Sequence, residues 1–233
     1  MTTLNDILAH SLFFGGAACL LTYQLGILLQ KRIKSPLFNP QVFSMAVIII
    51  FLLLFDVDYE TFDYSARYIT WFLTPATVCL AVPLYEQFHQ LKKHWFAILT
   101  GILSGVLISA VTILLTSILF DIGHELYVSL LPKSITTAIG MAVSEQQGGI
   151  VAITVASIVI TGNLGNIAGP GICRLFKITE PIARGIAMGT SSHVMGTSKA
   201  MEMGKTEGAM SSLSIAVAGL FTVVFVIVFS SLY

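Results

Sequence analysis

The residues that could do chemistry lie in two short stretches of an otherwise apolar chain. The first, residues 131–137, combines a proline, a lysine and three hydroxyl side chains. Pro132 favours the start of a helix running toward Val143, which would leave the backbone amides of residues 133–136 unpaired. Free amides at a helix N-terminus attract an anion, and a lysine adds a full positive charge. This stretch therefore predicts an anion site whose ligands are Lys133, Ser134, Thr136 and Thr137.

Lys133 also has a structural alternative. A lone lysine at mid-membrane costs roughly 2.5–3.5 kcal/mol on insertion scales. A lysine near the mouth of a hairpin can avoid this cost by extending its ammonium group to the membrane interface. The residues alone leave both interpretations of Lys133 open.

The second stretch, residues 189–199, is too rich in glycine and hydroxyl groups to face lipid. Its glycines, Gly189 and Gly196, allow the backbone to turn or to approach a ligand, and hydroxyls can bind carboxylate oxygens. An unperturbed histidine titrates near neutral pH, so His193 is a candidate coupling group that carries a proton or holds the anion. The alternative is a neutral histidine bonded to a neighbouring carbonyl. The candidate ligands here are Thr190, Ser191, Ser192, His193 and Thr197.

Weaker polar signals interrupt two further apolar segments. Residues 161–166 place two asparagines in one apolar helix, where their amides need partners. Contact between helices is the favoured interpretation, and Asn163 is kept as a candidate ligand. Pro75 and Pro83 should bend the segment 67–86. With Pro132, Gly189 and Gly196 they complete the set of expected structural breakers.

The composition identifies the elements that must position these residues as membrane helices. Of 233 residues, 55% are hydrophobic and only 10% charged, and the mean hydropathy is +0.87. Soluble domains carry about a quarter charged residues. Equal numbers of basic and acidic residues indicate no surface for nucleic acid. Three scattered cysteines, without a Cys/His cluster, predict neither disulfides nor a metal site, and no cofactor is expected.

A helix needs about 20 apolar residues to cross the bilayer. Six stretches qualify, namely residues 7–29, 40–56, 67–86, 95–120, 149–173 and 208–233. Two more, 126–145 and 184–203, are apolar but interrupted. They predict either full spans, giving eight, or two re-entrant hairpins beside six spans.

Charge in the short loops favours the hairpins, because lysine and arginine prefer the cytoplasmic side. If residues 126–145 crossed fully, Arg174, Lys177 and Arg184 would lie outside. If this segment re-enters from outside and residues 184–203 re-enter from inside, those three and the later lysines are cytoplasmic. The expected fold is therefore an all-α membrane protein with six spans and two opposed hairpins, with eight spans as the alternative.

A faint internal repeat points the same way. Residues 148–156 can be aligned with 208–216, and each follows an interrupted, hydroxyl-rich segment. The units 127–173 and 184–233 would then have opposite orientations, as in secondary transporters with broken helices. Small residues also recur in any packed membrane helix, so the repeat is a weak signal alone. We expect one membrane domain over 1–233, with scaffold-like helices in 1–125 and the site in 126–233.

These segments resemble the LrgB/CidB family of bacterial membrane proteins over nearly the whole chain. The motifs that carry the resemblance are 75–78 (PATV) with 81–85 (AVPLY), 131–137 (LPKSITT), 181–185 (PIARG), and 189–193 (GTSSH) with 196–197 (GT). Only Ile135, Val194 and Met195 depart from the expected pattern, and they cast no doubt on it. The resemblance implies either holin/antiholin-like control of murein hydrolase activity and lysis, or carriage of small carboxylates such as glycolate, glycerate or pyruvate.

Two functions follow as expectations. The first is a secondary transporter of small monocarboxylates; the alternative is a holin/antiholin-like modulator of murein hydrolase export and cell lysis. The resemblance implies a separate LrgA-like membrane partner. We also expect a multi-pass place in the bacterial inner membrane, contact with its lipid bilayer, and a homo-oligomer. No HExxH, GxSxG, phosphate-loop or paired intramembrane carboxylate motif predicts an enzyme.

Overall fold

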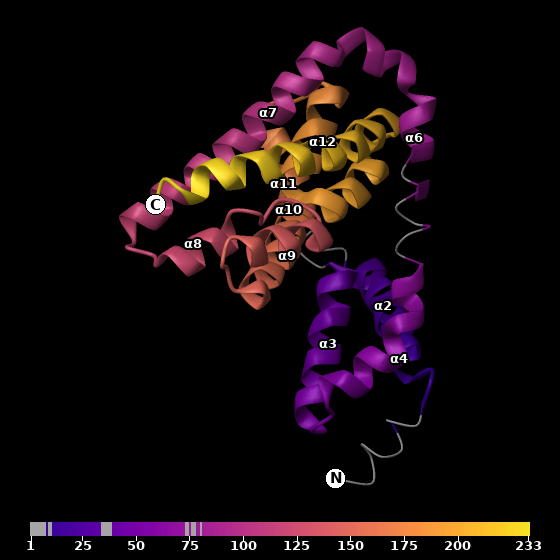
Figure 1. The fold of residues 1–233 in the computed structure, drawn as a ribbon. Coiled ribbons are helices and arrows are strands. Elements are labelled where there is room, and N and C mark those ends of the chain that lie inside the picture. Colours follow the sequence, from indigo (N-terminus) through magenta and orange to yellow (C-terminus); the bar gives the residue numbers. More distant parts are fainter. Residues whose placement is uncertain (1–7, 9–10, 34–38, 73–74, 76–77, 80) are drawn as a thin grey trace. The chain divides into compact units, whose positions relative to one another are not determined.

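The computed structural model describes residues 8, 11–33, 39–72, 75, 78–79 and 81–233, and within these ranges the chain is all helical without strands. The all-α prediction is therefore confirmed. The chain forms two compact units, Met1–Cys79 and Leu80–Tyr233, each described by itself below (Figure 1).

The first unit packs three helices through small residues. Its helices are α2 (Phe14–Ile33), α3 (Pro40–Leu54) and α4 (Tyr59–Trp71). The backbone amide of Gly15 donates to the Ser65 hydroxyl over 2.8 Å, which joins α2 to α4. The Thr22 and Ser44 hydroxyls lie 2.6 Å apart and join α2 to α3. Hydroxyl contacts of this kind hold helices together where lipid offers no hydrophobic driving force.

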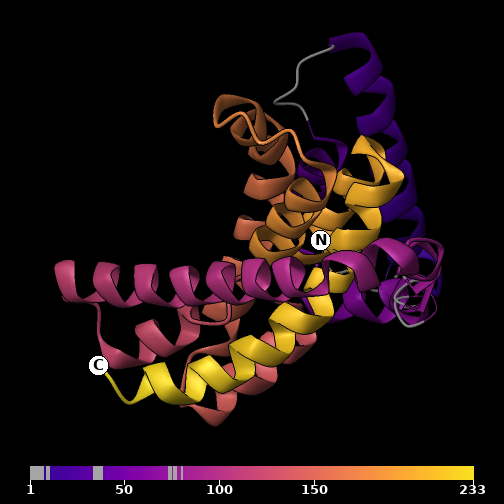
Figure 2. The same ribbon diagram turned by 90° about the horizontal axis from the view of Figure 1, so that it is seen from above.

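The second unit contains the three helices that are long and apolar enough to cross a membrane within the described ranges. Its helices are α6 (Ala81–Glu86), α7 (Phe88–Leu119), α8 (His124–Leu130), α9 (Thr137–Gln146), α10 (Val151–Leu175), α11 (Pro181–Met203) and α12 (Lys205–Ser230). The three candidate spans are Lys92–Leu119 of α7, together with α10 and α12. Both ribbon views show α7 and α12 crossing each other (Figures 1 and 2).

These helices match the predicted spans 95–120, 149–173 and 208–233, but the N-terminal spans differ from the prediction. Of the segments 7–29 and 40–56, the structure shows α2 from Phe14 and the shorter apolar α3. For the predicted span 67–86, α4 ends at Trp71, α6 begins at Ala81, and residues 75, 78 and 79 between them are helical, so the bend expected at Pro75 stays a prediction. Part of the intervening segment lies outside the described residues. Pro83 lies within α6, and the neighbours of Pro75 at 73–74 and 76–77 are not described.

The first interrupted segment, residues 124–146, is a hairpin of α8 and α9. The chain turns over residues 131–136, where the Ile135 amide donates to the Pro132 carbonyl over 3.3 Å. The two arms then meet at Thr154 of α10, whose hydroxyl bonds the Ser129 carbonyl at 2.9 Å and the Ser144 hydroxyl at 2.7 Å. We call residues 124–146 the first hairpin.

The helix predicted to start at Pro132 starts instead at Thr137, with Thr136 as its N-cap residue. The Lys133 amide is not free either, since it donates to the Leu130 carbonyl over 3.1 Å. The reason is that proline fixes its own φ for a helical turn but equally well for the tight turn that follows α8. The predicted cradle of free amides at residues 133–136 is therefore wrong.

The second interrupted segment, α11, folds back on itself. Ser192 (φ −135°, ψ 15°) and His193 (φ 42°, ψ −131°) leave the helical conformation. A side chain at Gly196 would collide with the Met188 carbonyl, eight residues earlier, so the two arms lie side by side. Because an L-residue at positive φ is strained, the surrounding contacts must hold this reversal in place. We call residues 181–203 the second hairpin.

Both ends of the second hairpin lie beside the start of α12. A Cβ at Gly185 would lie 2.5 Å from the Glu207 carbonyl, and a Cβ at Gly208 would lie 2.8 Å from Cγ of Met201. At the far end of α12, the Tyr127 hydroxyl of the first hairpin donates to the Phe229 carbonyl over 2.8 Å. The two hairpins therefore have their bases at opposite ends of α12.

Two clusters of buried apolar side chains pack these two ends. The first core cluster lies by the first hairpin and contains Ala110, Ile113, Tyr127, Val128, Leu131, Val143, Val226 and Phe229. The second core cluster lies by the base of the second hairpin and contains Ile98, Ile102, Val106, Ile186, Ala209, Met210 and Ala218. Ser134 of the first hairpin and Thr190 of the second hairpin line a common cavity.

Candidate functional site: a cavity between the two hairpins

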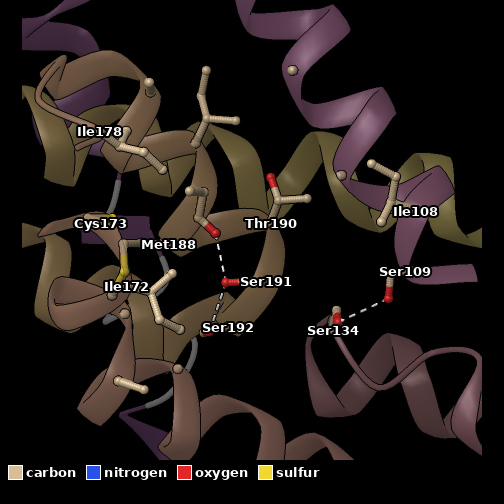
Figure 3. A pocket seen from close by; sticks show the side chains of 18 of the residues that line it. Ile108, Ser109, Ser134, Ile172, Cys173, Ile178, Met188, Thr190, Ser191 and Ser192 are labelled. Atoms are coloured by element: carbon tan, nitrogen blue, oxygen red, sulfur yellow. Dashed lines mark hydrogen bonds between the residues drawn. The ribbon is translucent and has the colours of Figure 1, made fainter. Parts of the chain in front are cut away.

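A cavity of about 1050 Å³ lies within the second unit, bounded by α7, α10, α11 and the 131–136 turn. Its inner end carries the side chains of Lys133 and Ser134, and its other end is lined by His94 and Glu180. The walls between are mainly apolar and include Ile108, Leu164, Ile172, Ile178, Ile186 and Met188 (Figure 3). An apolar pocket with a few convergent polar groups is typical of a small-molecule site.

Lys133 is held at the inner end by hydroxyl groups. Its ammonium donates to the Ser109 hydroxyl of α7 over 3.3 Å and to the Ser134 hydroxyl over 3.2 Å. The two ion pairs formed by described residues are Arg184–Glu207 and Lys199–Glu202, so neither includes Lys133. Within the described residues its charge is therefore bonded to neutral groups and not to a carboxylate.

The second hairpin faces this lysine with three hydroxyl side chains. Thr190 is only 7% exposed, and its Oγ1 has no hydrogen-bond partner among the described residues. Ser191 donates to the Ala187 carbonyl over 2.7 Å and lies 3.0 Å from the Ser192 hydroxyl. Figure 3 shows these side chains across the cavity from Ser109 and Ser134. A ligand between the hairpins would meet one cation and several hydroxyls.

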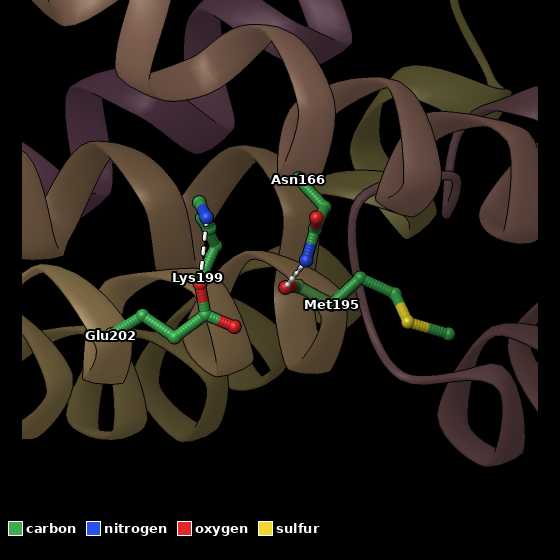
Figure 4. A network of polar contacts seen from close by, with 4 residues as sticks. All are labelled: Asn166, Met195, Lys199 and Glu202. Carbon is green, nitrogen blue, oxygen red and sulfur yellow. Dashed lines mark hydrogen bonds and ion pairs between the residues drawn. The ribbon is translucent and has the colours of Figure 1, made fainter. Parts of the chain in front are cut away.

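The tip of the second hairpin docks against small residues of α10. A side chain at Gly165 would overlap that of Ser192, and a Cβ at Gly162 would lie 2.6 Å from the His193 ring. Asn166 donates from Nδ2 to the Met195 carbonyl over 2.8 Å (Figure 4). The reversal of the second hairpin therefore packs against the glycines of residues 161–166 and is bonded by Asn166. This confirms the prediction of helix–helix contact for Asn166.

His193 is part of this docking and does not line the cavity. It is 4% exposed, and its Nε2 lies 3.0 Å from the Ile158 carbonyl. Because a carbonyl can only accept, Nε2 carries a proton. Thr197 donates to the His193 carbonyl over 2.9 Å and lies 2.7 Å from the Ser211 hydroxyl. The structure therefore shows the structural alternative left open for His193, and its coupling role stays a prediction.

The remaining predicted residues are not brought to the cavity. Asn163 donates to the Val159 carbonyl of its own helix over 2.9 Å, and its Oδ1 is buried without a partner among the described residues. Thr136 and Thr137 begin α9, and the Thr136 side chain makes no capping bond. Gly189 serves close packing against Ser211 of α12 and is not a break point. Gly196 and Pro132, by contrast, lie at or beside the two reversals.

The cavity thus joins five of the predicted ligands and adds residues that the sequence did not indicate. The predicted lining residues are Lys133, Ser134, Thr190, Ser191 and Ser192; the additional polar ones include Ser109, Thr112 and Thr161. Single hydroxyls in long apolar helices give no signal, because most of them bond back to their own helix. The described residues contain no group of three or more His, Cys, Asp or Glu side chains arranged to hold a metal ion.

Comparisons of the sequence with family models and with individual proteins point to the same family. Residues 19–232 match the model of the LrgB-like family. The chain is 35% identical over 218 residues to the antiholin-like protein LrgB of Bacillus mycoides (strain KBAB4), covering 93% of this chain and 95% of that protein. The same values hold for the antiholin-like protein LrgB of Bacillus cereus (strain B4264). No solved structure matches.

Proposed function

Because the chain belongs to the LrgB-like family, we propose that it has an antiholin-like function in the membrane and that its molecular activity is carriage of a small monocarboxylate through the cavity between its hairpins. The antiholin-like part is supported by the names of its relatives. The carrier part is supported by the geometry of the site, and the two parts need separate tests.

The observation that carries the proposed activity is the uncompensated charge of Lys133. A cation within a membrane is costly even when it is only partly buried, and such residues commonly mark the path of a substrate or ion. A monocarboxylate would supply the single negative charge that the described neighbours of Lys133 lack. The hydroxyls of Ser134 and Thr190 would donate to the remaining carboxylate or α-oxygen positions. The class of pyruvate, glycolate and glycerate fits this set.

The proposed topology has six spans and two opposed re-entrant hairpins, with units 127–173 and 184–233 as an inverted repeat. Its support is the segregation of charge between the ends of the second unit. Basic side chains occur in the segments at the end with the base of the second hairpin, namely Lys92, Lys93, Arg174, Lys177, Arg184, Lys199 and Lys205. The segments at the other end carry Asp121, Glu125 and Glu145 without a lysine or arginine. The positive-inside rule makes the first end cytoplasmic.

In this topology the cavity opens toward the cytoplasm, since His94 and Glu180 line its outer part. Hairpins that enter from opposite faces and meet at mid-membrane are a recurring plan of secondary transporters. A bacterial inner-membrane location, a homo-oligomer and an LrgA-like membrane partner complete the proposal. The antiholin-like function would then consist in modulating murein hydrolase export and lysis together with that partner.

Transport in proteoliposomes tests the carrier part. We expect saturable uptake of labelled pyruvate, glycolate or glycerate by the purified protein, without release of an encapsulated dye such as carboxyfluorescein. Dye release without saturable uptake would contradict the carrier and favour a pore. Absence of both would also remove the carrier proposal.

Lysis of cells tests the antiholin-like part. A strain that lacks this chain should lyse earlier or more extensively when murein hydrolase export is induced, and wild-type protein should restore the delay. Unchanged lysis with and without the chain would contradict this part, whatever the uptake assay shows.

A further inference from the structure

A second, much smaller cavity lies directly beyond Lys133. Its volume is about 10 Å³, close to the minimum of roughly 10–15 Å³ that holds one water molecule. Four elements contribute one hydroxyl side chain each to its lining, namely Ser109 of α7, Ser134 of the turn, Thr190 of α11 and Thr222 of α12. Three of these, all but Thr222, also line the large cavity, so the two cavities share a wall.

Thr190 indicates that this small cavity receives a ligand atom. Its Oγ1 is buried and has no partner among the described residues, although a buried hydroxyl left unpaired costs about 1–3 kcal/mol. The space available to this hydroxyl is the two cavities that its side chain lines. A water molecule or an oxygen of a passing solute would satisfy it.

The remaining lining of the small cavity is apolar and closed. It consists of Val106, Ala110, Leu131, Phe225 and Val226. Ala110, Leu131 and Val226 are 7%, 4% and 2% exposed and belong to the first core cluster. The path from the large cavity therefore passes a ring of hydroxyls and then stops at packed hydrocarbon.

We propose that the small cavity is the narrowest point of the solute path, that the hydroxyls of Ser109, Thr190 and Thr222 contact the passing carboxylate beyond Lys133, and that Ala110, Leu131 and Val226 form its closed gate. This inference rests on the proposed carrier function. Hydroxyl groups can replace the water molecules around a small anion one by one. The gate residues exclude water, so the anion can leave only when the first hairpin and α12 separate.

Variants that open the gate test whether its apolar residues close the path, and this test needs no known substrate. Leu131→Ser and Val226→Ser place a polar group in the apolar seal, and each variant is incorporated into planar bilayers in potassium chloride. We expect a steady anion conductance at least tenfold above that of wild type. The matched control is Ile102→Ser, an equally buried residue of the second core cluster, which should lose stability without gaining conductance.

Leu131→Ser protein that keeps its cooperative thermal unfolding but shows no added conductance would overturn the gate. Equal conductance from Ile102→Ser would also overturn it, since general loosening would then explain the effect. The conductance test gives a result even if the wild type transports no monocarboxylate. Absence of monocarboxylate transport would instead contradict the proposed function.

Replacing threonine by valine, which has the same shape but no hydroxyl, tests whether the hydroxyls contact the carboxylate. Thr190→Val and Thr222→Val should raise KM for monocarboxylate uptake at least fivefold, and Thr222→Ser should restore it. A purely structural Thr190 hydroxyl predicts the opposite, because removing an unpaired buried polar group leaves the melting temperature equal or higher and uptake unchanged. Thr116→Val is the control, since this hydroxyl bonds the Thr112 carbonyl of its own helix. Unchanged KM in both valine variants would overturn the hydroxyl ring.

Discussion

Both hairpins reverse the direction of the chain, but they do so through different turns, and the polar side chains at the two turns have different partners. The first hairpin reverses over residues 131–136 and leaves Lys133 and Ser134 facing the cavity. The second reverses at Ser192 and His193, and the His193 ring at its tip bonds the Ile158 carbonyl of α10. The long turn leaves its lysine facing the cavity, whereas the tight reversal uses its histidine to hold the hairpin against α10.

The tight reversal should be the most sensitive part of the unit to added volume. In Gly196→Ala the new methyl group would meet the Met188 carbonyl and Cβ of Ser192. Overpacking typically costs 1–3 kcal/mol, and a contact with rigid backbone should place this variant near about 3 kcal/mol. Thermal unfolding in detergent measures the loss.

Gly171→Ala is the matched control, because the Cβ that it would add has no atom within 4 Å apart from the neighbouring backbone of its own helix. It should unfold at or slightly above the wild-type temperature, since alanine favours a helix. Equal destabilisation of both variants would show that the two arms of α11 are not in contact.

His193 comes next, and it separates a structural from a coupling role. His193→Ala removes the bond to the Ile158 carbonyl, so we expect a loss of about 1–3 kcal/mol in unfolding free energy. The pH profile of monocarboxylate uptake should keep its shape, because His193 does not line the cavity. A variant with unchanged stability and a flattened pH profile would instead establish His193 as the coupling group.

Replacing the two asparagines of α10 should change stability by smaller and unequal amounts. Asn166→Ala breaks a bond to the second hairpin and should cost about 1 kcal/mol. Asn163→Ala removes a bond within its own helix together with an unpaired oxygen, so its melting temperature should stay near that of wild type. If Asn163→Ala were the more damaging variant, the proposed docking of the tip on Asn166 would be wrong.

The smallest effect is expected at Lys199. Its ammonium lies 2.6 Å from Glu202 on an exposed face (Figure 4). Exposed pairs contribute about 0–1 kcal/mol, so Lys199→Gln should change neither stability nor uptake measurably. A clear loss of uptake in this variant would extend the site beyond the cavity.

Much of the first hairpin could be predicted from its residues, because proline, lysine and clustered hydroxyls are incompatible with a lipid-facing helix. The exact helix start could not, since Pro132 suits a turn as well as a first helical position. The reversal at Ser192 and His193 could be placed only within an 11-residue stretch. Its position depends on docking against Gly162 and Gly165, which lie some 30 residues away in the chain.

The hydroxyl groups that α7 and α12 contribute to the site could not be predicted from the sequence, for a different reason. Ser109 and Thr222 are single hydroxyls in long apolar helices, just like Thr116, whose hydroxyl bonds its own helix. Only the packing of α7 and α12 against the hairpins distinguishes them. The buried carboxylate of Glu207, 3.9 Å from Arg184 at the base of the second hairpin, was missed likewise.

Uptake by a matched pair of variants tests most directly whether the first hairpin holds the solute through Lys133. Lys133→Gln and Lys199→Gln remove the same charge from the same unit, one inside the cavity and one on the surface. In proteoliposomes with equal amounts of folded protein, we expect Lys133→Gln to lower saturable monocarboxylate uptake at least tenfold and Lys199→Gln to leave it unchanged. Wild-type uptake by Lys133→Gln, or equal losses in both variants, would contradict the account.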